Sequence, residues 1–304
     1  MSRYISIDIG GTFIKYGLLL EDGEILLQEK IRTPKNLADF KKCLQDICQH
    51  LSKDIVIEGI AVSCPGKVDS ENGIIYFGGS LPYLHEFQMR SYLKTETGLP
   101  ISVINDGKAA ALAEKWKGNL TDTPNGVALV LGTGLGGGII LNYQLLQGSH
   151  YQAGEFSFFL PNDEFSDLDH LAGKKYSPVG MIEAVATLLG LPDKKDGKKV
   201  FEYINQGDGR ALKPFHQFCD YLAQFIYNMQ AIIDVERVVI GGGISAQPIV
   251  VEEIKNRYNK LISDLPFIGP MLTPVDILPC QFAGDANLIG ALYHLLSEKN
   301  SSAL

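Results

Sequence analysis

One pattern occurs twice in the chain and constrains the fold more than any other feature. Tyr4–Ile9 alternates apolar residues in the way that predicts a strand, which breaks at Gly10-Gly11-Thr12 and resumes as a second apolar run. Val127–Leu131 predicts another strand, which reaches the glycine run Gly132–Gly138 and continues as Ile139–Leu141. One glycine turn is common, but two matched strand–turn–strand units indicate two halves that begin alike.

Chain length and the order of the predicted elements favour two lobes. The 304 residues exceed what a single hydrophobic core usually serves. Three consecutive strands are followed by alternating helices and strands, which predicts an α/β protein with a mixed sheet and flanking helices in each lobe. The polar, turn-rich segment 118–125 marks the boundary, so we expect an N-terminal lobe of residues 1–118 and a C-terminal lobe of residues 119–304. We expect the terminal helix, from about residue 285, to complete the N-terminal lobe.

The spacing of apolar residues predicts further elements. Helical spacing covers Leu37–Leu51, Phe87–Thr97 and Asp106–Lys117, and an apolar run predicts a strand at Ile55–Val62. We expect a long loop at Gly148–Lys175.

The composition restricts the class of partner. The formal net charge of −8 argues against nucleic acid or an anionic membrane as the main partner, and no apolar run is long enough to cross a membrane. The five cysteines are odd in number and include no Cys-x-x-Cys pair, which is typical of reduced thiols in a cytosolic protein. Because Met1 is followed almost at once by the first strand, we expect no leader segment and a cytoplasmic protein.

The first glycine turn has the chemistry of an anion site. Gly10 and Gly11 let the backbone approach a ligand closely, and the Thr12 hydroxyl adds a donor to the amides of the turn. Asp8 brings a carboxylate next to this site, which suits a divalent cation held between carboxylate and phosphate. We assign Lys15, in the following strand, to the same site. The alternative is an ordinary tight turn beside a surface aspartate.

The second glycine run contains Gly132-x-Gly134-x-x-Gly137, which matches a dinucleotide-binding fingerprint. That fingerprint must open a helix, whereas here the chain continues as the strand Ile139–Leu141. The context therefore excludes a dinucleotide-binding fold.

Together the glycine segments predict a nucleotide site. Two glycine hairpins facing each other across a cleft, the second formed by Gly132-Thr133-Gly134, would clamp a polyphosphate. Gly241-Gly242-Gly243 lies between a strand and a helix, where the lack of side chains leaves space for adenine and ribose. The implied ligand is ATP with Mg²⁺, the cation being held by Asp8 through water. Phosphoryl transfer then needs positioning, charge neutralisation and a base.

Asp106 is the candidate for that base. It lies between a predicted strand and a predicted helix, where a carboxylate within hydrogen-bond reach of an alcohol can accept its proton. The alternative is that Asp106 caps the helix, because aspartate is a favoured N-cap residue. Asn105 could hold a sugar hydroxyl or shape the turn, and Glu155 could accept hydrogen bonds from a sugar or lie exposed on a loop.

These segments, in this order, resemble the ROK family of bacterial sugar kinases and repressors, part of the actin/hexokinase-like (ribonuclease H-like) ATPase superfamily. The likeness covers nearly the whole chain and rests on Asp8–Thr12, Asn105-Asp106, Leu131–Gly138, Ala153-Gly154-Glu155 and Ile240–Gly243. It implies two lobes, ATP with Mg²⁺ in the cleft and transfer to a sugar hydroxyl, usually the 6-position. The resemblance assigns Asp106 as base, Asn105 and Glu155 as sugar contacts, and Gly66, Lys67, Gly79 and Ser80 to loops that line the sugar pocket.

The chain departs from the family pattern where members bind zinc. Typical members have a histidine where this chain has Phe158, and a cysteine-rich loop that ends before a Glu-Ala pair, here Glu183-Ala184. No cysteine occurs between Cys64 and Cys219, so the tetrahedral ligand set is missing and we expect no structural zinc. Glu183 either keeps the family's contact with the sugar or lies on a helix surface.

In lacking the zinc loop and its histidine, the sequence resembles the branch of the family that contains β-glucoside kinases. Phe158 and Phe159 would suit a wider apolar pocket that stacks on a second ring, or they pack in the core. A β-glucoside is therefore one hypothesis for the substrate, and glucose, N-acetylmannosamine and fructose are alternatives.

Two competing functions belong to the same fold. Repressors of the family carry a winged-helix domain ahead of the kinase-like body. From the position of Asp8 we expect no such domain here, and the acidic charge agrees. The other alternative is a sensor that binds sugar or nucleotide without turnover, which the intact Asp106 and glycine hairpins disfavour. Because dimers are common in the family, we expect a homodimer that binds a small sugar and ATP, with no nucleic-acid or membrane partner.

Overall fold

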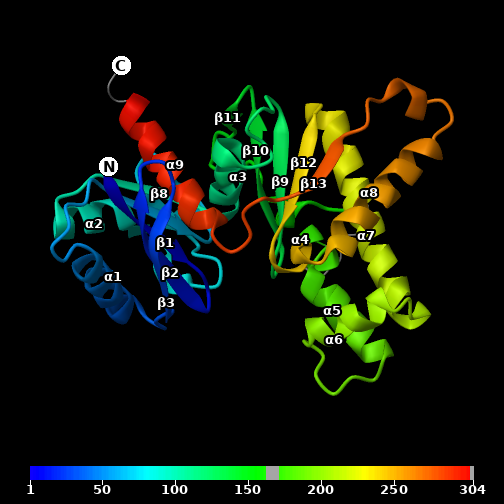
Figure 1. The fold of residues 1–304 in the computed structure, drawn as a ribbon, viewed down its shortest axis with the longest axis horizontal. Helices are drawn as coiled ribbons and strands as arrows, with labels where there is room; N and C mark the ends of the chain where they lie inside the picture. Colours follow the sequence, from blue (N-terminus) through cyan, green and yellow to red (C-terminus); the bar gives the residue numbers. More distant parts are fainter. Residues whose placement is uncertain (162–170, 302–304) are drawn as a thin grey trace. The chain divides into compact units, whose positions relative to one another are not determined.

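The computed structural model describes residues 1–161 and 171–301, which form two compact units (Figure 1). Unit 1 comprises Met1–Gly118, Leu145–Ala153 and the C-terminal segment from Asp285. Unit 2 comprises Asn119–Gln144 and the described part of Gly154–Gly284. The short segment Leu145–Ala153 therefore belongs to unit 1, although both of its neighbours in the chain belong to unit 2.

Unit 1 is built on a five-stranded sheet of order β3-β2-β1-β4-β8. β1 (Arg3–Ile9), β2 (Phe13–Leu20) and β3 (Ile25–Arg32) form an antiparallel meander. β4 (Ile60–Cys64) lies parallel to β1, and β8 (Ile101–Asn105) lies parallel to β4. A smaller antiparallel sheet consists of β5 (Lys67–Asp69), β6 (Ile74–Tyr76) and β7 (Phe87–Gln88).

The alternation of side chains along β1 divides the helices between the two faces of the larger sheet. Ile5, Ile7 and Ile9 are fully buried in one core with apolar side chains of α1 (Leu37–Leu51) and α2 (Met89–Thr97). On the other face, the Ser6 hydroxyl donates to the Leu288 carbonyl of α9 (Ala286–Ser301) at 2.8 Å. Because α9 packs beside α3 (Asp106–Lys117), helices cover both faces (Figure 1).

Unit 2 repeats this arrangement with the strand order β11-β10-β9-β12-β13. β9 (Gly126–Leu131) and β10 (Leu135–Leu141) are antiparallel, and β11 (Gln144–Leu145) follows as the edge strand. β12 (Arg237–Gly241) is parallel to β9, and β13 (Asp276–Pro279) is parallel to β12. The predicted repetition of the strand–turn–strand unit and the predicted α/β class are confirmed.

The longest helix of unit 2 is α7 (Gly209–Ile233), which packs against α5 (Pro178–Leu188) and α8 (Pro248–Ser263). The Phe225 ring of α7 contacts three other aromatic rings at centroid distances of 5.2 to 6.1 Å, those of Phe156, Phe159 and Tyr176. The part of the chain that the structure describes also contains η1 (Pro82–Leu84), η2 (Phe156–Phe158), α4 (Ala172–Lys175), α6 (Gly197–Asn205), η4 (Gly243–Ala246) and η5 (Gly269–Met271).

Some predicted bounds are wrong. The strand predicted at Ile55–Val62 begins only at Ile60, where its ladder with β1 starts. The helix predicted at Phe87–Thr97 begins at Met89, because Phe87 pairs with Ile75 in the small sheet. The predicted loop Gly148–Lys175 contains η2 and α4, and its residues 162–170 lie outside the described part of the chain.

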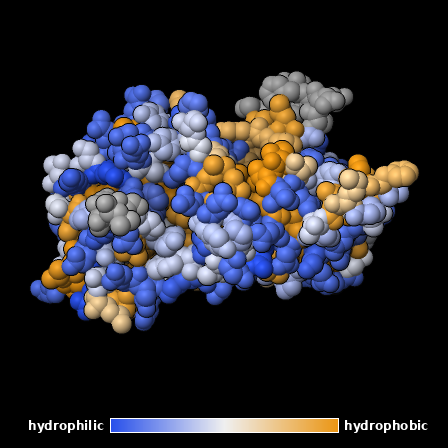
Figure 2. All heavy atoms as spheres, turned by 90° about the horizontal axis from the view of Figure 1, so that it is seen from above, coloured by the Kyte–Doolittle hydropathy of each residue, from blue (hydrophilic) through white to orange (hydrophobic). Residues whose placement is uncertain are grey.

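The glycine run after β9 enters strand β10 and does not open a helix, which confirms the exclusion of a dinucleotide fingerprint. Within residues 1–161 and 171–301, no helix has the length and apolar character needed to span a membrane. Hydrophilic and hydrophobic residues are interspersed on the face that Figure 2 shows.

The packing of α9 on α3 generates a prediction about stability. A Cβ atom at Gly290 would collide with the backbone carbonyl of Ala109, which cannot move without displacing α3. We therefore expect Gly290→Ala to lower the free energy of unfolding by about 1–3 kcal/mol, the usual cost of overpacking. Gly209→Ala is the control, because a Cβ there meets no atom within 4 Å. Equal urea midpoints for both variants and the parent chain would contradict the prediction.

Candidate functional site

Most of the predicted site residues of unit 1 lie at one edge of its sheet. Asp8 is near the carboxyl end of β1, Gly66 follows β4, and Asn105 ends β8. Because β1, β4 and β8 are parallel, these ends meet at the same edge, which is where open α/β sheets bind ligands.

Asp8 is a buried carboxylate held by two hydrogen bonds. Its side chain is 8% exposed, and Oδ1 accepts from Ser63 Oγ at 2.9 Å and from Asn287 Nδ2 at 3.0 Å. Burial raises the pKa of the Asp8 carboxyl above its ordinary value, while these two bonds and the charge of Lys15 oppose the increase. The alternative of a surface aspartate beside a turn is therefore wrong.

The turn Gly10–Thr12 is anchored so that its tip remains exposed. The Thr33 hydroxyl donates to the Gly10 carbonyl at 2.6 Å, and the Thr33 amide donates to the Thr12 carbonyl at 3.0 Å. Gly11 lies against the Ser80 side chain, which leaves no space for a Cβ. Lys15 pairs with Asp8 across the β1–β2 ladder, which puts both side chains on one face.

Asn105, and not Asp106, caps α3. Its Oδ1 accepts from the Lys108 amide at 3.1 Å, and its Nδ2 donates to the Gly66 carbonyl at 3.0 Å. Asp106 is the first helical residue, and its Oδ1 accepts from the Gly107 amide at 2.8 Å. The capping alternative for Asp106 is thus wrong, and of the two interpretations of Asn105 the structure displays the one that shapes the turn.

The charges of Asp8 and Asp106 both act on the Cys64 thiol of β4. Burial raises the pKa of this thiol well above its usual value, and the charges of Asp106 and Asp8 add to the increase. Both carboxylates therefore act on one point at the end of β4.

The two predicted sugar loops of unit 1 touch each other. Gly66, with φ of +91°, lies so close to Gly78 that a Cβ would come within 2.9 Å of its Cα. A Cβ added at Gly79 would likewise come within 3.2 Å of the Pro65 Cβ. Lys67, in β5, places Nζ 5.3 Å from the centroid of the Tyr76 ring. The loops therefore form one surface next to Asn105.

In unit 2, both predicted glycine segments lie at the carboxyl ends of adjacent parallel strands. Gly132-Thr133-Gly134 follows β9, and Gly241 ends β12 and is followed by Gly242 and Gly243. Gly242, with φ of +95°, lies directly against the Leu131 carbonyl, so that no side chain fits. Ser177, the N-cap of α5, donates from Oγ to the Thr133 carbonyl at 2.9 Å and so holds the loop.

The remaining predicted residues of unit 2 differ in their surroundings. Glu155 precedes η2 and Glu183 lies on α5, and both are partly exposed. Phe159 packs edge-to-face on Phe225 at 5.2 Å, as the core alternative predicts, whereas Phe158 is 63% exposed.

Sequence reasoning missed three residues that support the unit 1 site. Ser63 and Asn287 hold Asp8, and Asn287 lies 279 residues away from it in sequence. Lys108 is 1% exposed, and its ammonium donates to the Gln147 side chain at 2.9 Å and to the Tyr151 carbonyl at 3.0 Å. Lys108 thereby ties segment Leu145–Ala153 to α3, and neither local pattern nor spacing signals such long-range contacts.

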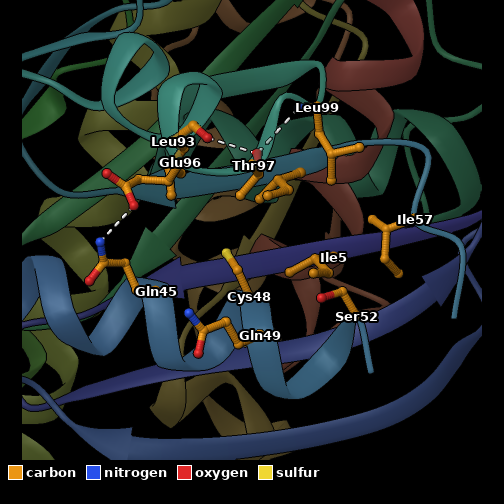
Figure 3. A pocket seen from close by; sticks show the side chains of 11 residues that line it. Ile5, Gln45, Cys48, Gln49, Ser52, Ile57, Leu93, Glu96, Thr97 and Leu99 are labelled. Atoms are coloured by element: carbon orange, nitrogen blue, oxygen red, sulfur yellow. Dashed lines mark hydrogen bonds between the residues drawn. The ribbon is translucent and has the colours of Figure 1, made fainter. Parts of the chain in front are cut away.

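A separate pocket of about 350 Å³ lies between α1 and α2 (Figure 3). Ile5, Cys48 and Leu93 line it, and beside it Gln45 Nε2 donates to Glu96 Oε2 at 2.6 Å. Ile5 points to the face of the sheet opposite Asp8, and none of the predicted site residues lines this pocket. It is therefore distinct from the candidate site.

Two five-stranded sheets with the same strand arrangement, and glycine turns at the carboxyl ends of their strands, define the actin/hexokinase-like class of fold. The ROK family model matches residues 4–169 and 176–298, so the chain belongs to the ROK family. It is 33% identical over 303 residues to a β-glucoside kinase of Klebsiella pneumoniae, covering 96% of this chain and 95% of that protein.

Solved structures agree with this assignment. A ROK family protein from Streptococcus pneumoniae, in complex with sucrose, has a TM-score of 0.86 at 30% identity, covering 98% of this chain and 99% of that one. A ROK family glucokinase from Streptomyces griseus, in complex with glucose and AMPPNP, has a TM-score of 0.81 at 26% identity, covering 96% of this chain and 98% of that one. The predicted fold class is confirmed.

The buried Asp8 generates a prediction about pH. Because the pKa of the Asp8 carboxyl is raised in the folded state, the protonated carboxyl favours folding at a pH below the unfolded-state pKa. This contribution to stability is lost as the pH rises through the folded-state pKa. At pH 7 without divalent cations, we expect Asp8→Asn to raise the melting temperature, because the uncharged amide can accept the same bonds.

The advantage of Asp8→Asn should shrink as the pH falls toward about 3.9, the ordinary pKa of aspartate. Asp46→Asn, at an exposed position of α1, is the control and should show no such pH dependence. A melting temperature for Asp8→Asn below that of the parent chain at pH 7 would contradict the account of Asp8.

Proposed function

We propose that the protein is an ATP-dependent sugar kinase that phosphorylates a hydroxyl group of a hexose or hexoside, the 6-hydroxyl being the expected acceptor. The observation that carries the proposal is the position of Asp106. It starts α3 at the sheet edge where Asp8 and the exposed turn Gly10–Thr12 also lie, while Asn105 caps the helix. The β-glucoside kinase and the glucokinase among the relatives support the same reaction class.

In the proposed reaction, Asp106 is the general base. The acceptor oxygen attacks the γ-phosphorus of ATP, its proton passes to the Asp106 carboxylate, and the bond to the β-phosphate oxygen breaks to release ADP. The start of a helix favours a negative charge, which stabilises Asp106 as the carboxylate that accepts the proton. The amide of Gly107 fixes one carboxylate oxygen, which orients the other.

The proposed nucleotide contacts come from both units. Unit 1 supplies Gly10-Gly11-Thr12 and Lys15 to the phosphates, and unit 2 supplies Gly132-Thr133-Gly134 to the phosphates and Gly241-Gly242-Gly243 to adenine and ribose. The support is that each segment lies at the carboxyl end of a strand, and that Gly11 in the first segment and Gly242 in the third have no space for a side chain.

The residues around Asp8 fit a magnesium ion held through water. A carboxylate that burial penalises, oriented by Ser63 and Asn287, gains from a hydrated divalent cation nearby. When bound, Mg²⁺ would neutralise charge on the ATP phosphates. Structural zinc is not part of the proposal, and elemental analysis of the purified protein tests this.

For the sugar, we propose contacts from Gly66, Lys67, Gly79, Ser80 and Asn105 of unit 1 and from Glu155 and Glu183 of unit 2. A β-glucoside is the favoured acceptor, because the relative that is 33% identical is a β-glucoside kinase. Glucose and N-acetylmannosamine are the next candidates.

A coupled assay of ADP release distinguishes a kinase from a sensor that only binds. The panel should contain glucose, N-acetylmannosamine, fructose, methyl β-D-glucoside and cellobiose, with ATP and Mg²⁺ in excess. We expect release that depends on at least one of these sugars. Sugar binding by calorimetry without any sugar-dependent release would establish the sensor instead.

Asp106→Asn tests the assigned base. We expect kcat to fall by about two to four orders of magnitude, the usual contribution of general base catalysis, because the amide cannot accept the proton. Sugar affinity measured by calorimetry should remain near that of the parent chain. Asp122→Asn, at an exposed position of unit 2, is the matched control. Full activity in Asp106→Asn would rule out the assignment.

A further inference from the structure

Phe77 is an unusual residue at the end of the small sheet of unit 1. It directly follows β6, its side chain is 70% exposed, and its φ is +56°. A left-handed backbone is costly for a large aromatic residue, whereas glycine adopts it readily. The next two residues are glycines, and one of them, Gly79, has a φ of +57°. An exposed ring is thus kept at a strained position that glycine would suit better.

His85 supports the Phe77 ring and its backbone. The two rings are stacked with centroids 4.4 Å apart and an interplanar angle of 22°. The Phe77 amide donates to His85 Nδ1 at 3.2 Å, so the imidazole also holds the strained residue. With one face against His85 and most of its surface exposed, the Phe77 ring offers its other face to a ligand.

The segment that carries Phe77 borders the candidate site of unit 1. Gly78, which follows Phe77, lies against Gly66, and the Gly66 carbonyl accepts from Asn105 next to the proposed base. Ser80, three residues after Phe77, lies against Gly11 of the exposed turn. Strained backbone positions cluster at functional sites, so the strain at Phe77 agrees with a role in ligand binding.

We propose that Phe77, backed by His85, is the stacking platform for the second ring of a β-glucoside, either a sugar ring or an aryl group. The inference rests on the proposed kinase function and adds a determinant of acceptor selectivity. An aromatic face binds flat apolar ring surfaces, whereas free glucose has no second ring to place there. The platform therefore belongs to unit 1, and not to the pair Phe158-Phe159 of unit 2.

The test compares acceptors with one ring and with two. The kcat/KM values for glucose, methyl β-D-glucoside, cellobiose and phenyl β-D-glucoside are measured for the parent chain and for Phe77→Ala. We expect kcat/KM for cellobiose and the phenyl glucoside to fall roughly threefold to tenfold, through a higher KM, which is the range that one aromatic stacking contact provides. Values for glucose and methyl β-D-glucoside should change less than about twofold on the same scale.

Further variants separate stacking from folding. Phe77→Gly suits the left-handed backbone, so its melting temperature should equal or exceed that of the parent while the two-ring selectivity is lost. Phe77→Trp should retain the selectivity, and His85→Ala should lose part of it. Phe267→Ala is the control, because Phe267 is 87% exposed in unit 2.

The possible outcomes distinguish this inference from the proposed function. Equal losses for one-ring and two-ring acceptors, or no loss in Phe77→Gly, would overturn the platform and leave the kinase function intact. A loss of two-ring selectivity in Phe158→Ala instead of in the Phe77 variants would also overturn the platform. So would the finding that the parent chain phosphorylates glucose but no two-ring acceptor. Absence of turnover with every sugar would overturn the proposed function itself.

Discussion

The side-chain amide of Asn105 is the contact on which the proposed site of unit 1 depends. One end of the amide caps α3 through the Lys108 N–H, and the other end holds the Gly66 carbonyl. A single side chain thus fixes the start of the helix that carries Asp106 and the loop next to it. Since Asn105 is the N-cap, the Asp106 carboxylate is not needed for that role, which supports the proposal that it acts as the base.

Asp8 differs from Asn105, because the burial of its carboxyl is unfavourable for the charged form. Burial opposes the ionisation of Asp8, and hydrogen bonds from Ser63 and Asn287 and the charge of Lys15 offset part of that cost. Such an arrangement is typical of sites whose energy is recovered when a ligand or cation binds. Phe77 is a second unfavourable feature beside the site, because a large aromatic residue there has a left-handed backbone conformation.

Much of the fold was predictable because its signals are local. The repeated glycine hairpin predicted the matched sheets, and the alanine-rich pattern predicted α3 with the bounds observed. β13 follows Pro274 and ends at Pro279, and these prolines hide a four-residue edge strand from pattern reasoning. The glycines and carboxylates of the candidate site could be chosen from local sequence patterns, whereas the Asn287–Asp8 hydrogen bond joins residues 279 positions apart and has no local signal. The strain at Phe77 gives no signal in the sequence at all.

The central claim is that Asp106 faces the acceptor hydroxyl. Its most direct test is a crystal structure of the protein with Mg²⁺, a non-hydrolysable ATP analogue and the best acceptor from the assays. We predict the 6-hydroxyl oxygen of the sugar within hydrogen-bond distance of an Asp106 carboxylate oxygen, with the analogue's terminal phosphate aligned behind it. A bound acceptor whose hydroxyl groups all lie out of hydrogen-bond reach of Asp106 would contradict the account.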